Sequence, residues 1–149
     1  MSTRNLTMVV NRKYAEDNEH GFAQNPTNLD DSSHVNMYLH HDGYPEWHGV
    51  QLANWVKANA RQDSSAMAAK LVHDMYYDSC YLYPEASQID HQYTYVIWTG
   101  DRNDMWISCY DQYSNNCVFV LKPNKIVEKY SDKRFEEGYT KYTDWAITN

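Results

Sequence analysis

The chain has 149 residues, 42% of them hydrophobic, and its 13 basic and 20 acidic residues give a formal net charge of −7. This length predicts a single domain, residues 1–149, whose core needs neither metal nor disulfide support. The negative charge argues against direct binding to a nucleic-acid backbone, because such binding requires clustered Lys and Arg to displace counterions.

The charge is unevenly distributed, with 7 basic and 15 acidic residues in 1–120 and 6 and 5 in 121–149. An acidic surface favours a basic protein partner, or a partner whose DNA-binding surface this protein occupies in place of DNA. The simpler interpretation is that the charge only keeps the protein in solution. The 14 Tyr and 5 Trp indicate a surface that makes contacts, since these side chains bury area and keep a polar group.

No targeting or membrane segment is predicted. The amino terminus lacks the apolar stretch of a signal peptide, and no run approaches the roughly 20 apolar residues that span a bilayer. The three cysteines are an odd number at unrelated spacings, which argues against a secreted disulfide framework. We therefore expect a cytoplasmic protein with no membrane contact.

Two strands are predicted near the amino terminus. Residues 5–11 alternate, and residues 35–41 place Val35, Met37 and Leu39 on one face, which is the period of a half-buried strand. The two strands could pair as a wide antiparallel hairpin. Between them, residues 12–33 are polar and without periodicity, and a loop of this length in a compact domain tends to be functional or disordered.

A corner and a first helix follow. Asp42-Gly43 breaks the strand pattern, because Gly tolerates positive φ and the Asp side chain can hydrogen-bond to nearby backbone. Pro45 has the fixed φ with which a helix can begin. Apolar side chains spaced by 3.6 residues then predict a helix over residues 46–60.

A second helix is predicted over residues 65–80, with Asp63 among the candidate N-caps. Its tail is strongly aromatic and stops at Pro84. Because that stretch holds no Lys or Arg, its tyrosines favour core packing or a protein interface over base stacking. These tyrosines are Tyr76, Tyr77, Tyr81 and Tyr83.

The remaining chain predicts a meander. The run over 93–98 is apolar on both faces, as in a central strand. Further strands are expected over 105–110 and 117–121, and Pro123 indicates a corner after them. The predicted fold is α+β: an antiparallel sheet of about five or six strands with the two helices packed on one face.

The candidate metal ligands are His40, Asp42 and His48. Imidazole and carboxylate groups are usual ligands of zinc and of catalytic iron or manganese. His40 and His41, however, are neighbours on a strand, so their side chains point to opposite faces and cannot readily share one metal. The alternative is that the histidines hydrogen-bond within the corner, and we expect no cofactor.

The segment over residues 36–45 resembles a Tyr-x-His-x-Asp-Gly-Tyr-Pro segment of small phage-encoded proteins. The matching residues are Tyr38, His40, Asp42, Gly43, Tyr44 and Pro45. The resemblance implies a small phage-type accessory protein, many of which bind and disable a host enzyme or defence complex. It transfers no catalytic residue, because that family has no established activity.

The leading functional hypothesis is a non-catalytic inhibitor, similar to anti-CRISPR or other anti-defence proteins, that binds a host or defence-system protein. The alternative is a metal-dependent hydrolase or a nucleotide-sequestering protein centred on His40, Asp42 and His48. The oligomeric state is not predicted. The candidate binding residues are Glu16, Asp17, Glu19, Asp30, Asp31, Asp101, Asp104, Asp111, Tyr76 and Tyr77.

Overall fold

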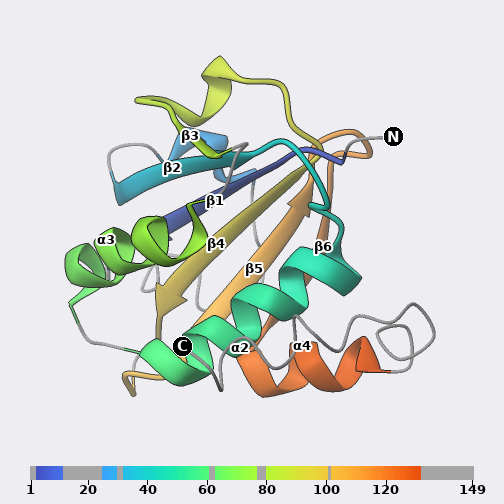
Figure 1. The fold of residues 1–149 in the computed structure, drawn as a ribbon. Coiled ribbons are helices and arrows are strands. Elements are labelled where there is room, and N and C mark those ends of the chain that lie inside the picture. The colour runs from blue at the N-terminus through green and yellow to red at the C-terminus, as the bar shows by residue number, and fades with distance from the viewer. Residues whose placement is uncertain are drawn as a thin grey trace.

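The computed structural model describes residues 3–11, 25–29, 32–60, 63–76, 80–100 and 102–131 (Figure 1). These residues form an α+β fold. The strands are β1 (Asn5–Val10), β2 (Ser33–Leu39), β3 (Cys80–Leu82), β4 (Tyr93–Thr99), β5 (Met105–Asp111) and β6 (Asn116–Leu121). The helices are α2 (Val50–Asn59), α3 (Ser64–Met75) and α4 (Pro123–Lys129).

The six strands form one mixed sheet in the order β3-β2-β1-β4-β5-β6. The predicted antiparallel pairing of the first two strands is confirmed, with Asn5 opposite Leu39. The prediction of a purely antiparallel sheet is wrong, because β1 and β4 run parallel, with Asn5 opposite Tyr93. The chain between β1 and β4 includes β2, α2, α3 and β3, and this length allows β4 to lie beside β1 in the same direction.

The first predicted helix begins as a five-residue π-helical turn, Pro45–Gly49, and continues as α2. Pro45 occupies its first turn, as predicted. A third helix, α4, begins at Pro123, where a corner was predicted. None of the helices within the described ranges has both the length and the apolar character needed to cross a bilayer.

The second predicted helix is shorter than expected. Asp63 caps α3 by accepting hydrogen bonds from the backbone N–H groups of Ser65 and Ala66, at 3.0 and 3.2 Å. The helix ends at Met75 rather than at residue 80. Cys80–Leu82 instead pairs antiparallel with β2, because the sheet offers this short segment a hydrogen-bonding partner that overrides its local preference.

Two clusters of buried side chains lie against the sheet. The larger joins apolar residues of α2, α3 and α4 to sheet residues such as Met37 and Tyr95. The smaller includes Met8 and Val96, with partly buried residues such as Ile89 packed against it. Tyr95 and Val96 are consecutive in β4 and belong to different clusters, since neighbouring strand residues point to opposite faces. The central strands are therefore covered on both faces.

Candidate protein-binding surface

Strand β3 is an outer strand of the sheet and carries two exposed apolar side chains. Tyr81 and Leu82 each expose 57% of their surface. β3 pairs with β2, and no described strand pairs with its other side. The backbone N–H and C=O groups of an outer strand can pair with an extended segment of another protein.

A second exposed aromatic residue lies close to β3 along the chain. Tyr76 follows the last residue of α3 and exposes 71% of its surface. Four residue steps separate it from Cys80, which limits their separation to about 14 Å. Tyr76, Tyr81 and Leu82 together are called the β3 surface below.

Tyr81 packs on aromatic residues of the sheet, whereas Leu82 lies opposite Met37 and points to the other face. Tyr38 of β2 is buried and lies opposite Tyr81, with ring centroids 6.2 Å apart. Tyr83 meets the ring of Tyr38 edge-on at 6.0 Å. The hydroxyl of Tyr38 lies 2.7 Å from Nδ1 of His40. A ring packed in this way loses little further freedom when a partner binds, which lowers the entropic cost of association.

The two described acidic candidates have partners within the chain. Asp104 Oδ2 lies 3.2 Å from Nζ of Lys122. Asp111 Oδ1 accepts hydrogen bonds from the backbone N–H groups of Tyr113 and Ser114, at 2.9 and 3.3 Å, and so stabilises the β5–β6 turn. Asp104 precedes β5 and Asp111 ends it, which places them about 20 Å apart. The structure therefore does not bring them into one patch.

Of the predicted binding residues, only Tyr76 belongs to the β3 surface. Tyr81 and Leu82 were not among the candidate binding residues, although Tyr81 belongs to the tyrosine-rich stretch for which core packing or a protein interface was predicted. The other candidates lie outside the described residues, and their role stays a prediction. They are Glu16, Asp17, Glu19, Asp30, Asp31, Asp101 and Tyr77.

The three candidate metal ligands lie in different environments. His40 is partly exposed beside Tyr38, and Asp42 is exposed with a φ of 57°. His48 is 1% exposed, and its Nε2 lies 3.0 Å from Oγ1 of Thr7. Within the described ranges, no three His, Cys, Asp or Glu side chains are grouped so that they could hold a metal ion.

Hydrogen bonds and close packing hold the corner around Gly43. Asp42, not Gly43, takes the positive φ that was expected of the glycine. Gly43 is required by space, because a Cβ there would lie 2.7 Å from Cβ of Asn5 and 2.8 Å from the carbonyl oxygen of Thr3. Its N–H donates to Thr3 O at 2.8 Å, and its carbonyl accepts from the Tyr95 hydroxyl at 2.6 Å. The corner thus ties the start of β1 to β4.

His48 is a neutral, buried residue of this corner. Burial lowers the pKa of His48 to about 3. Its ring packs against that of Tyr95, with centroids 4.9 Å apart. The Thr7 hydroxyl lies 3.3 Å from Oδ1 of Asn5 and 3.0 Å from Nε2 of His48, so the three side chains form a buried polar network. These contacts favour the structural interpretation of the histidine.

Comparison of the chain with protein-family models, curated proteins and solved structures finds no match. The geometry of the described residues defines an α+β protein with a mixed sheet and an apolar, aromatic outer strand.

Proposed function

We propose that this protein is a small phage-type accessory protein that binds and inhibits a host or anti-phage defence protein without catalysing a reaction. The observation that carries the proposal is the exposure of Tyr81 and Leu82 on an outer strand. Tyrosine is among the residues that most often carry binding energy at protein interfaces. The resemblance of residues 36–45 to phage-encoded proteins supports the phage origin.

The proposed mode of binding is addition of an extended segment of the partner to β3. Because β3 has only three residues, it offers few main-chain hydrogen bonds. The apolar contacts of Tyr76, Tyr81 and Leu82 would then supply most of the affinity. Acidic residues at the edge of such an interface would mainly raise the association rate with a basic partner.

The double substitution Tyr81→Ser and Leu82→Ser tests this proposal. Tyr113→Ser is the matched control, because Tyr113 exposes 61% of its surface in the β5–β6 turn, away from β3. Partners captured from lysates of bacteria with defence systems are identified by quantitative mass spectrometry, and their activity is then assayed with purified proteins. We expect the wild type and Tyr113→Ser to inhibit the same partner at a 1:1 ratio. The double variant should bind it at least tenfold more weakly.

Circular dichroism establishes that each variant is folded before binding is compared. Equal inhibition by the double variant would contradict a role for the β3 surface. Inhibition that deepens with time at a small molar fraction of this protein would indicate catalysis and would contradict the proposed mechanism.

A further inference from the structure

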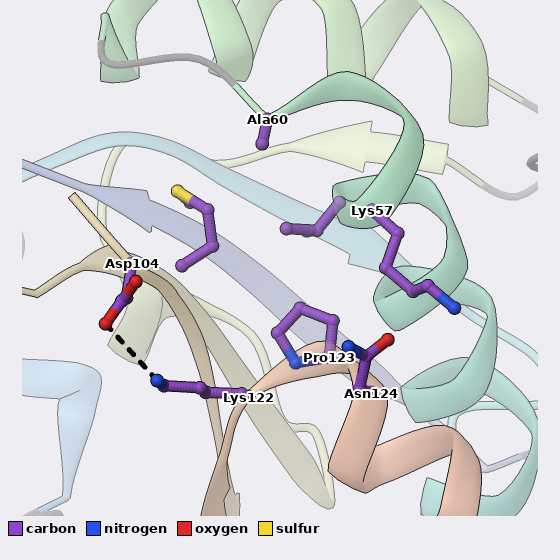
Figure 2. Close-up of a pocket in the computed structure, with 8 residues that line it drawn as sticks. Lys57, Ala60, Asp104, Lys122, Pro123 and Asn124 are labelled. Carbon is purple, nitrogen blue, oxygen red and sulfur yellow. Dashed lines mark hydrogen bonds and ion pairs between the residues drawn. The ribbon is translucent and has the colours of Figure 1, made fainter. Parts of the chain in front are cut away.

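A hollow of about 170 Å³ lies between the end of α2, the start of β5 and the start of α4 (Figure 2). For comparison, an apolar protein cavity of roughly 150 Å³ binds one benzene molecule. The hollow can therefore hold one aromatic side chain. It is lined by Val56, Lys57, Ala60, Asp104, Met105, Lys122, Pro123 and Asn124.

The lining combines an apolar interior with a polar mouth. Val56 and Pro123 are buried, and Met105 is half-buried. Lys57 and Lys122 are both exposed, the first from α2 and the second from the residue before α4. A site of this composition suits a ligand that has one apolar group and negative charge beside it.

Contacts within the chain restrict one wall of the hollow. Nζ of Lys122 lies 3.2 Å from Oδ2 of Asp104 and 5.3 Å from the ring centroid of Trp106 (Figure 2 shows the ion pair). Pro123 restricts the backbone at the start of α4. Little ordering is therefore needed on binding, which favours affinity.

The charge around the hollow is opposite in sign to that of the whole chain. Lys57 and Lys122 line it, and Lys125 and Lys129 line a second hollow on α4 that also includes Glu128. Among the described residues, the linings of the two hollows contain four lysines and two carboxylates, Asp104 paired with Lys122 and Glu128 paired with Lys125, whereas the whole chain carries −7. Such a local positive field attracts an acidic ligand.

We propose that this hollow binds an acidic peptide segment of a partner protein, which inserts one aromatic side chain and places carboxylates near Lys57 and Lys122. A peptide is favoured over a nucleic acid because four lysines on a chain with a net charge of −7 neutralise few phosphates. The hollow contains no residue of the β3 surface, so this proposal does not rest on the proposed function.

Fluorescence anisotropy with a labelled peptide of Glu and Asp around one central Trp tests the proposal. Ala60→Trp fills the hollow at an exposed position and should abolish binding. Lys57→Gln should weaken binding about fivefold, since it removes one charge at the mouth. Ala69→Glu, at an exposed site on α3, lowers the net charge by the same amount and should change affinity less than twofold.

A second peptide, with Ser in place of the Trp, should bind at least tenfold more weakly. The proposal is overturned if the wild type does not bind the first peptide, if both peptides bind equally, or if Ala60→Trp leaves binding unchanged. Tighter binding of a single-stranded oligonucleotide of equal charge would also overturn it. So would a concentration-dependent dimer that Ala60→Trp abolishes, because the occupant would then be a second copy of the chain.

Discussion

His48 shows how burial makes a single residue sensitive to pH. The ordinary pKa of histidine is 6.5, and burial lowers that of His48 to about 3. Between these two values the unfolded chain binds a proton that the folded chain does not. The free energy of unfolding must therefore fall as the pH is lowered through this range. Burial also lowers the pKa of His91, which adds in the same direction.

The substitution His48→Gln removes this proton-binding site. Between pH 6 and pH 4, the free energy of unfolding of the variant should fall less steeply than that of the wild type, by about 1 kcal/mol per pH unit. Urea unfolding followed by tryptophan fluorescence at each pH measures the two slopes. His91 and the carboxylates are present in both proteins, so their contributions to the two slopes are the same. Parallel slopes would show that His48 titrates normally.

The corner around Gly43 also shows which structural roles of single residues can be predicted from the sequence. Pro45 was correctly placed at the start of a helical segment, because its effect on the backbone is local. The role of Gly43 was not predictable, since the atoms that exclude a Cβ belong to Thr3 and Asn5. Likewise, no local signal shows that His48 meets Thr7, which lies 41 residues earlier.

Helices α2 and α3 are joined by a partly buried polar contact. Nε1 of Trp55 donates to Oδ2 of Asp74 at 2.9 Å, and Nζ of Lys70 donates to the same oxygen at 3.0 Å. Burial alone would raise the pKa of Asp74, but hydrogen bonds from Trp55, His73 and Lys70 together lower it. Asp74 is therefore charged at neutral pH. Its contribution to stability is lost as the pH falls below the ordinary value of 3.8.

Asp74→Ala should reduce the free energy of unfolding by about 2 kcal/mol, because it leaves the buried Trp55 N–H without an acceptor. In a double-mutant cycle with Trp55→Phe, the double variant should lose at least 1 kcal/mol less than the summed single losses. Urea unfolding at pH 7 provides all four values. Lys70→Ala is the control and should cost less than about 1 kcal/mol, since Lys70 is partly exposed. Additive losses would show that the Trp55–Asp74 contact does not couple the helices.

Among the helices and strands, hydrophobic periodicity predicted those whose own sequence contains the pattern of a buried face. Strand β2 follows from its alternation and β4 from its apolar run, and both were predicted within two residues of their bounds at each end. β3 was missed because a three-residue strand exists only through its pairing with β2. Leu82 was missed as an exposed residue for the same reason, and the sequence left Tyr81 open between core packing and a protein interface.

In the whole molecule, β1 connects strands β2 and β3 to strands β4, β5 and β6 within the sheet. It pairs with β2 on one side and with β4 on the other, and all its residues are buried. Its parallel pairing with β4 could not be predicted, because hydrophobic periodicity carries no information on strand neighbours or direction. Because the buried strand β1 pairs with both β2 and β4, we expect the sheet to unfold in one cooperative step.

Met8→Ala tests this cooperativity, since Met8 lies in β1 and is fully buried. The substitution should lower the free energy of unfolding by about 3 kcal/mol. Tryptophan fluorescence and far-UV circular dichroism should report the same lowered urea midpoint. Leu82→Ala, at the exposed edge, should change stability by less than about 0.5 kcal/mol. Separate midpoints from the two probes would indicate that the sheet unfolds in parts.

The central position of β1 also affects folding during protein synthesis. β1 leaves the ribosome before β4, and Asn5 cannot pair with Tyr93 until β4 has been made. At 5–20 residues per second, this delay lasts roughly 4 to 18 s. During that time a nascent β1–β2 hairpin exposes the edge that β4 will later cover, and such an edge can pair with other chains. Slower translation of residues 40–92 should therefore increase aggregation of the nascent chain without any change in its sequence.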